Sequence, residues 1–269
     1  MEPAAGITER LLERLSRARR LVVLTGSGVS HESGVPTFRG RDGLWKKYRA
    51  EELATRQAFE FDPELVWRWY DYRRQLIAEA APNPAHEAIA RLESHREHFD
   101  LVTQNVDGLH SRAGSRSPIE LHGNIWRARC TREGLTKELK ENPLRDIPPR
   151  CHKCGALLRP DVVWFGEPLP PSAYERADTA ARTCDAMLVV GTSAMVRPAA
   201  SLPLIAKHNG AYVVEINVSL TPISVLIDAS LVGRAGEILP ELVDRLLDRE
   251  GGRKPLIPGS SEKTESPSR

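Results

Sequence analysis

The chain has 269 residues, of which 41% are hydrophobic and 28% charged, proportions that are ordinary for a globular protein with one large core. Its formal net charge of +2 gives no general case for nucleic-acid or membrane binding, although a locally basic groove for a protein partner remains open. No apolar run approaches the length of a transmembrane helix, and the charges scattered through residues 9–15 are unlike a signal peptide. We therefore expect a cytoplasmic location.

Short apolar runs alternate with helical stretches along the chain. Runs typical of buried strands lie at residues 21–24, 101–103, 187–190 and 212–216, with a weaker candidate at 226–227. Helical periodicity covers residues 1–20, 85–96, 172–182 and 239–247. This alternation predicts an α/β fold, a doubly wound, Rossmann-like parallel sheet with helices on both faces.

Two segments interrupt the alternation. Residues 44–81 are helical and rich in Trp and Tyr, which predicts a small helical module over about 37–83. Residues 130–160 hold cysteines, charges and prolines, which predicts a metal-binding insert, ribbon-like, over about 125–159. We expect a single domain over 1–250, with a core formed by 1–36, 84–124 and 160–250. The composition of residues 251–269 is too polar to form a packed core, which predicts a disordered tail.

Polar residues follow each predicted strand. These loop segments are Thr25-Gly26, Gln104-Asn105-Val106-Asp107, Gly191-Thr192-Ser193 and Asn217-Val218-Ser219. Ligands of parallel sheets bind at the carboxyl ends of the strands, so we expect all four loops to line one crevice. Taken alone, Asn and Asp in such loops are more often turn formers than catalysts.

The stretch from Thr25 to Gly40 is the most informative part of the sequence. Glycines and small hydroxyl residues after a strand let a backbone approach a phosphate, and Arg39 adds a planar cation suited to a diphosphate. His31 stands where the third glycine of the usual dinucleotide fingerprint would fall, so this is not an ordinary dehydrogenase turn. The whole stretch resembles the NAD-binding signature of the sirtuins, with Ser27 in place of the usual alanine.

Two further motifs carry the same resemblance. Gln104-Asn105-Val106-Asp107 and His122-Gly123 match the sirtuin Gln-Asn-x-Asp and His-Gly motifs in order and spacing, and the resemblance covers roughly residues 21–247. It implies an NAD-dependent protein-lysine deacylase. The substrate amide oxygen attacks the nicotinamide ribose as nicotinamide leaves, and His122 acts as general base on the ribose hydroxyls. Free lysine and an acylated ADP-ribose result. A near-neutral imidazole pKa suits that role.

The resemblance also implies which residues bind NAD. These are Gly26, Ser27, Gly28, Ser30, Phe38, Arg39, Trp45, Gln104, Asn105, Asp107, Gly191, Thr192, Ser193, Asn217, Ser219 and Ala235. Within this set, Asn105 and Asp107 orient the ribose and nicotinamide, and Phe38 covers the reacting face. Arg39 and Ser193 contact the phosphates, and Asn217 and the backbone near Ala235 hold the adenosine half.

Substrate selection is expected from a second group of residues. Tyr70 and Arg73 stand at i and i+3 on one helix face, where a phenol and a guanidinium can grip a carboxylate. Without the family, a solvated helix face is the simpler interpretation. The pair resembles the Tyr-x-x-Arg element of class III sirtuins, which remove succinyl and malonyl groups, and Ala54 matches a small residue that widens their acyl pocket. The resemblance thus implies desuccinylase and demalonylase activity with some deacetylase activity.

The segment Val162-Val163-Trp164-Phe165-Gly166-Glu167 is typical of an apolar strand. In sirtuins the equivalent stretch pairs with the substrate peptide as an added strand, so Val163 and Phe165 are expected to bind substrate through main-chain bonds. The expected partners are acylated lysines of proteins, with no specific nucleic acid and no membrane, and we expect a monomer.

The expected zinc site departs from the family pattern. Sirtuins usually carry two Cys-x-x-Cys pairs, a ligand set for tetrahedral zinc. Here Cys151 and Cys154 form an intact pair, but the first pair has only Cys130, and Glu133 occupies the other ligand position. We expect a structural Zn²⁺ held by three cysteines with Glu133 or His152 as fourth ligand; a zinc-free loop is the alternative. Cys184 is expected to be a small buried residue.

Two rival functions remain open at this point. An ADP-ribosyltransferase or NAD hydrolase could use the same scaffold, but neither needs an acyl pocket. An NAD-sensing module without turnover would need no base at His122.

Overall fold

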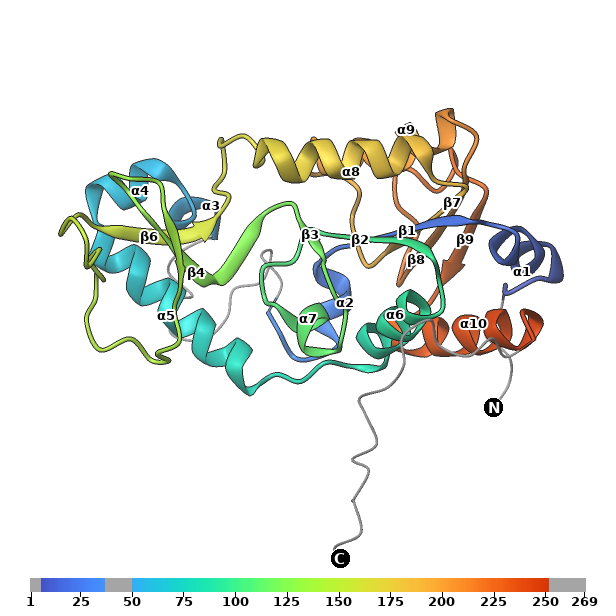
Figure 1. Ribbon diagram of the computed structural model, residues 1–269, viewed down its shortest axis with the longest axis horizontal. Helices are drawn as coiled ribbons and strands as arrows, with labels where there is room; N and C mark the ends of the chain where they lie inside the picture. Colours follow the sequence, from blue (N-terminus) through green and yellow to red (C-terminus); the bar gives the residue numbers. More distant parts are fainter. Residues whose placement is uncertain (1–5, 37–49, 252–269) are drawn as a thin grey trace, which may run out of the picture.

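The larger lobe is built on a parallel sheet that has six strands within residues 6–36 and 50–251, the part that the computed structural model describes. The strands are β1 (Arg20–Thr25), β2 (His98–Thr103), β3 (Ile119–Glu120), β7 (Ala186–Val190), β8 (Tyr212–Asn217) and β9 (Ala229–Val232). They lie in the order β3-β2-β1-β7-β8-β9 (Figure 1). The sheet is wound outward in both directions from β1 and β7, and ligands of such sheets bind at this point of reversal. The predicted doubly wound fold is confirmed.

Helices cover both faces of this sheet. One face carries α1 (Glu9–Ser16), α6 (Pro84–Ser94) and α10 (Ala235–Arg249), and the other carries α8 (Pro171–Thr183) and α9 (Leu202–His208), as Figure 1 shows. Along β1, Leu21 and Val23 pack against the first layer, whereas Val22 and Leu24 pack against the second. A strand that is buried on both faces therefore has a continuous apolar sequence. Short helices α2 (Ser27–His31) and α7 (Leu109–Arg112) follow β1 and β2.

The smaller lobe combines helices with an antiparallel sheet. The helices are α3 (Ala50–Leu53), α4 (Arg56–Phe61) and α5 (Pro63–Glu79), and the strands β4 (Gly123–Cys130), β5 (Thr136–Glu138) and β6 (Leu158–Val162) lie in the order β5-β4-β6. Trp67 of α5 is fully buried and donates its indole N–H to the carbonyl of Leu158 at 2.7 Å, which ties helix to sheet. Helices α3 to α5 lie within the predicted helical module, whose bounds remain a prediction, and residues 37–49 lie outside the described part.

Two expected strands are wrong in position. Residues 226–227 form a turn in which Leu226 is half exposed, and the edge strand is β9, which pairs in parallel with β8. β6 ends at Val162: the N–H of Val163 still donates to His122, the residue before β4, but that of Phe165 donates to Ala54 in the loop between α3 and α4. The predicted domain boundaries remain predictions, and the expected tail lies largely outside the described residues.

In the described residues, no helix combines the length and the apolar character that a membrane crossing requires.

Candidate active site

The loops after β1 and β7 are interlocked at the centre of the sheet. Gly26 donates its N–H to the carbonyl of Val190 at 3.0 Å, and Gly28 donates to the carbonyl of Gly191 at 2.8 Å. A Cβ on Gly28 would lie 2.8 Å from the Gly191 Cα, closer than packed carbon atoms allow. The glycines that suggested a phosphate-binding turn are thus also required by the contact between these two loops.

The four strand-end loops form one hydrogen-bonded network. Gln104 donates from Nε2 to Thr192 Oγ1, and Asn217 donates from Nδ2 to the Thr192 carbonyl, both at 3.0 Å. Asn105 donates from Nδ2 to the Gly26 carbonyl and to Ser30 Oγ, again at 3.0 Å. The expected convergence of these loops is therefore present in the structure.

Asp107 is a buried carboxylate beside this network. The N–H of Leu109 donates to its Oδ1 at 2.9 Å. Burial raises the pKa of Asp107, while the hydrogen bonds from Leu109 and Ser30 and the positive charge of Arg73 act in the opposite direction. Ser30 thus links Asn105 to Asp107, and these three polar side chains are held in fixed relative positions.

His122 follows the short edge strand β3, and its ring lies against the second loop. Its Nδ1 lies 2.9 Å from the carbonyl oxygen of Gln104. A carbonyl can only accept, so Nδ1 carries the hydrogen and Nε2 is left as the basic nitrogen. Burial lowers the pKa of His122, against the opposing effect of the Gln104 carbonyl. The imidazole is accordingly neutral near pH 7, as a general base requires.

Residues 163–165, which we call the strap, connect His122 to the smaller lobe. The N–H of Val163 donates to the His122 carbonyl and that of Phe165 donates to the Ala54 carbonyl, both at 2.9 Å. Between them, Trp164 donates from Nε1 to the hydroxyl of Tyr70 at 3.0 Å. Ala54, Tyr70 and His122 therefore all touch one tripeptide, although they are widely separated in sequence.

Comparison with known proteins identifies this arrangement. Residues 26–198 match the model of the Sir2 family. The chain belongs to the Sir2 family. It is 55% identical over 244 residues to NAD-dependent protein deacylase 2 of Pyrobaculum aerophilum, covering 91% of this chain and 98% of that relative. The sirtuins are NAD-dependent protein deacylases, so the expected enzyme class and its NAD requirement are confirmed.

Solved structures agree with this assignment. A crystal structure of a Sir2 homolog in complex with NAD superposes with a TM-score of 0.87 at 49% identity, covering 93% of this chain and 97% of the other. A Sir2 protein bound to an acetylated peptide superposes with a TM-score of 0.79 at 32% identity, covering 90% and 98%. The described lobes of this sirtuin therefore have the arrangement found in NAD-bound and peptide-bound relatives.

The remaining predicted NAD-binding residues are placed as follows. Ser27 and Ser219 are exposed, Ser193 is half-buried, and Phe38, Arg39 and Trp45 lie outside the described residues. The N–H of Ala235 donates to Glu32 Oε1 at 2.8 Å, and that of Gly236 to Glu32 Oε2 at 3.1 Å. Glu32 thus caps the first turn of α10, where a carboxylate is favourable. The N–H of Ala235 already donates to this carboxylate.

Three cysteines of this sirtuin gather at one end of the smaller sheet. The Sγ atoms of Cys130, Cys151 and Cys154 lie within 4.8 Å of one another, and those of Cys130 and Cys154 are 3.5 Å apart. Zn–S bonds of about 2.3 Å in a tetrahedral site separate sulfurs by about 3.8 Å, so the cluster fits zinc. Among the described residues, neither Glu133 nor His152 adds a ligand atom to this group. Cys184 is buried elsewhere, as expected.

Sequence reasoning missed several residues that support the site. The hydroxyl of Thr25 donates to Thr103 Oγ1 at 2.8 Å and lies 2.9 Å from His110 Nε2, and Thr103 in turn accepts the N–H of Asn105 at 3.0 Å. In the sequence, Trp164 is only one member of an apolar segment. A buried indole N–H needs a partner, and this requirement was the available signal for its bond to Tyr70.

Proposed function

We propose that this sirtuin removes succinyl and malonyl groups from protein lysines, and acetyl groups to a lesser extent. The products would be nicotinamide, O-acyl-ADP-ribose and free lysine. The observation that carries the proposal is the position of the Tyr70 hydroxyl, which lies fully buried one hydrogen bond from the strap beside His122.

The hydroxyl of Tyr70 is prepared to donate a hydrogen bond. Burial raises its pKa to about 12, so the phenol stays protonated throughout the physiological range. Its oxygen already accepts from Trp164, which leaves the O–H hydrogen for an acceptor such as an acyl carboxylate.

Arg73 supplies the complementary charge. It lies one helical turn after Tyr70 on α5, and its positive charge acts on both Tyr70 and Asp107. Tyr70 and Arg73, which we call the acyl selector, would together bind the terminal carboxylate of the acyl group, because a guanidinium binds carboxylates through two charge-assisted bonds. Ala54, fully buried beneath the strap, leaves room for a longer acyl chain.

The other site residues have distinct proposed roles. NAD, when bound, supplies the ribose carbon that accepts the acyl oxygen as nicotinamide leaves. Asn105, Ser30 and Asp107 would orient the ribose, and His122 would accept a ribose hydroxyl proton at Nε2. Because the N–H groups of Val163 and Phe165 are already engaged, a substrate strand would bond to their carbonyl oxygens.

Mass spectrometry of products tests the activity. Peptides carrying succinyl-, malonyl- or acetyl-lysine are incubated with NAD, and nicotinamide and acyl-ADP-ribose are measured. We expect both products from all three peptides, with the acidic acyl groups preferred. Nicotinamide without a peptide requirement would indicate an NAD hydrolase, and no release at all would indicate a sensor.

Arg73→Met tests the selector. Loss of a bidentate charge-assisted contact worth about 2–3 kcal/mol should lower desuccinylation on the order of 100-fold, with deacetylation changed only a few-fold. Arg68→Met is the matched control, since Arg68 lies on the same helix but is exposed and paired with Glu64. The selector fails if Arg73→Met leaves desuccinylation intact while deacetylation drops.

A further inference from the structure

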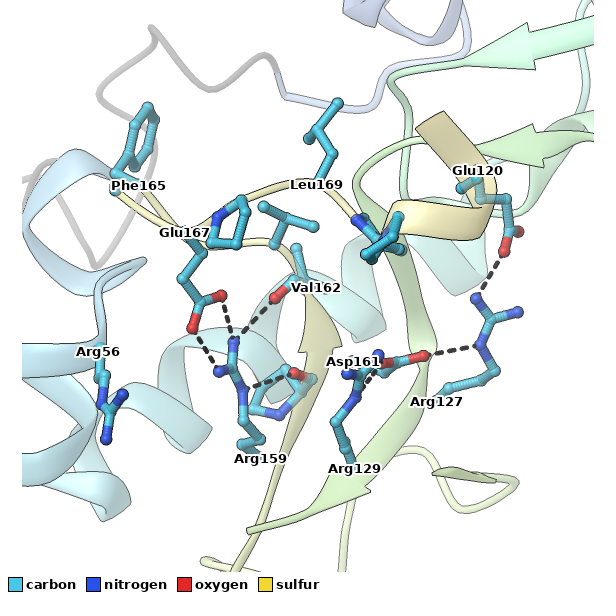
Figure 2. A pocket seen from close by; sticks show the side chains of 18 of the residues that line it. Arg56, Glu120, Arg127, Arg129, Arg159, Asp161, Val162, Phe165, Glu167 and Leu169 are labelled. Atoms are coloured by element: carbon cyan, nitrogen blue, oxygen red, sulfur yellow. Dashed lines mark hydrogen bonds and ion pairs between the residues drawn. The ribbon is translucent and has the colours of Figure 1, made fainter. Parts of the chain in front are cut away.

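A cavity of about 680 Å³ opens between the lobes, bordered by the strap and separate from the strand-end loops. Figure 2 shows it below the segment that runs from Phe165 to Leu169, with β4 and β6 forming its back wall. Five arginines line it, and we call it the arginine cleft. They are Arg56, Arg127, Arg129, Arg159 and Arg176.

The arginine cleft has more positive than negative side chains. Its carboxylates are Glu120, Asp161 and Glu167, three against five arginines. Arg127 bonds both Glu120 and Asp161, Arg129 shares Asp161, and Arg159 pairs with Glu167. These four ion pairs use all three carboxylates of the wall, so the remaining charge belongs to the outer arginines.

Arg56 and Arg176 supply this excess charge. Arg56 pairs with Glu60, but both side chains are largely exposed, and such pairs bind weakly. Arg176 is exposed on α8 and makes no ion pair within the described residues. Arg129 is also nearly half exposed despite its bond to Asp161. An incoming anion can therefore bind guanidinium groups of the cleft while the ion pairs within its wall stay intact.

The arginine cleft adjoins the residues that would hold the acylated lysine. Gly123 and Val163 belong to its lining; Gly123 follows His122 in sequence, and Val163 bonds the His122 carbonyl. Prolines at 118, 160, 168, 170 and 171 stiffen the walls, so little ordering entropy is lost on binding. A peptide held on the strap can thus extend its flanking residues into this cleft.

We propose that the arginine cleft binds acidic side chains that flank the acylated lysine in substrate proteins. This rests on the proposed deacylase function and adds to it the class of protein sequence selected. Carboxylates on the wall would repel a continuous phosphate backbone, whereas separate Asp or Glu side chains can reach individual arginines. A protein segment therefore fits this surface better than a nucleic acid does.

Two peptides with the same succinyl-lysine test the proposal. One carries Asp and Glu on both sides of the lysine, and the other carries Ala and Gln. Dissociation constants are measured by fluorescence anisotropy, and kcat and KM by product formation, at low and high salt. We expect about tenfold tighter binding and lower KM for the acidic peptide, equal kcat values, and loss of the difference in about 0.5 M salt.

Arg129→Gln with Arg176→Gln should abolish the preference and leave the neutral peptide unchanged, which also shows that the variant is folded. The single variant Arg176→Gln should bind the acidic peptide about threefold more weakly and bind the neutral peptide as the wild type does. Arg17→Gln and Arg68→Gln, at exposed arginines outside the cleft, are matched controls that should retain the preference.

The measured dissociation constants separate this proposal from the proposed function, because binding does not require turnover. Tight acidic-peptide binding that depends on Arg129 and Arg176 supports the cleft even if no turnover is seen. Equal binding of both peptides, or equal losses for both in the variants, overturns it. Displacement of the acidic peptide by a 12-nucleotide single strand at lower concentration than by unlabelled peptide would also overturn it, in favour of a nucleic-acid site.

Discussion

The geometry of His122 fits the proton transfer that we propose for it. The Gln104 carbonyl orients the ring and sets its tautomer, while burial keeps it neutral. Gln104 therefore contacts Thr192 through its side chain and holds the His122 ring through its backbone carbonyl. Any change that moves the second loop should affect NAD binding and catalysis together.

His122→Asn should lower kcat by 10²- to 10⁴-fold, the usual contribution of a general base, with little change in NAD affinity. The wild-type rate should fall as pH drops through the pKa of His122, and because burial lowers that pKa, the midpoint should lie below about pH 6.5. Steady-state kinetics from pH 5 to 8 measure both effects.

His208→Asn, at an exposed position that ends α9, is the control and should leave the profile unchanged. A midpoint above pH 7 in the wild type, or full activity of His122→Asn, would contradict the assigned role.

At the scale of secondary-structure elements, the close contact of two loops decides the geometry of the crevice where we propose that NAD binds. Gly28 and Gly191 touch backbone to backbone, and Thr192 next to them receives bonds from Gln104 and Asn217. The position of Thr192 therefore depends on the absence of a side chain at residue 28.

Gly28→Ala should separate the loops, costing about 1–3 kcal/mol of stability and weakening NAD binding at least tenfold. Gly210→Ala is a control that destabilises by a different route, because Gly210 has a left-handed φ of +90° but no atom within 4 Å of an added Cβ. Thermal unfolding with and without NAD measures both quantities. Equal NAD affinity in the two variants would show that the loop contact does not control the crevice.

The cysteine cluster determines whether the smaller sheet is cross-linked by metal. Cys130 ends β4, and Cys151 and Cys154 precede β6, so zinc would join the two strands at their ends. Cys151→Ser should reduce bound zinc well below one ion per chain and lower the melting temperature by about 5–10 °C.

Elemental analysis and calorimetry measure these effects, and a chelator should reproduce them in the wild type. Cys184→Ser should keep its zinc, because Cys184 is buried far from the cluster in sequence and belongs to the core under α8. Metal-free wild-type protein with an unchanged melting temperature would favour the zinc-free alternative.

At the scale of the whole molecule, two buried histidines link stability to pH. His86 and His110 are both buried, and their rings lie with centroids 4.7 Å apart at an interplanar angle of 58°. Burial lowers the pKa of His86 to about 4, and burial together with His86 lowers that of His110 to about 3. Both are neutral in the folded protein near pH 7.

Unfolding restores both pKa values to about 6.5, so between that pH and the folded values the unfolded chain binds more protons. Stability should therefore be complete above about pH 6.5 and fall as the pH is lowered toward 4, by on the order of 3 kcal/mol for His86. Urea unfolding at pH 7, 6 and 5 measures the slope. His86→Leu should flatten it, and an unchanged slope would contradict the prediction.

Much of this molecule could be predicted from local pattern. The central strands are buried on both faces, so each appears as a short apolar run, and the polar residues after them mark the crevice. Edge strands carry no such signal: β9 is partly exposed and β3 has two residues, so their positions depend on pairing with β8 and β2. The segment after β6 is apolar and so resembles a strand in the sequence. Its Trp164 is apolar because it is buried against Phe59 and Arg159, not because the segment pairs in a sheet.

The sequence by itself determined the family, the doubly wound fold and the three clustered thiols, because these depend on residue types at short spacing. Only the tertiary structure decided that Gly28 is needed for contact with Gly191, that Glu32 caps α10, and that Tyr70 reaches the strap through Trp164. It also gathered the five arginines from α4, β4, β6 and α8. Such contacts join segments dozens of residues apart, and their partners are chosen by packing, which short-range patterns do not encode.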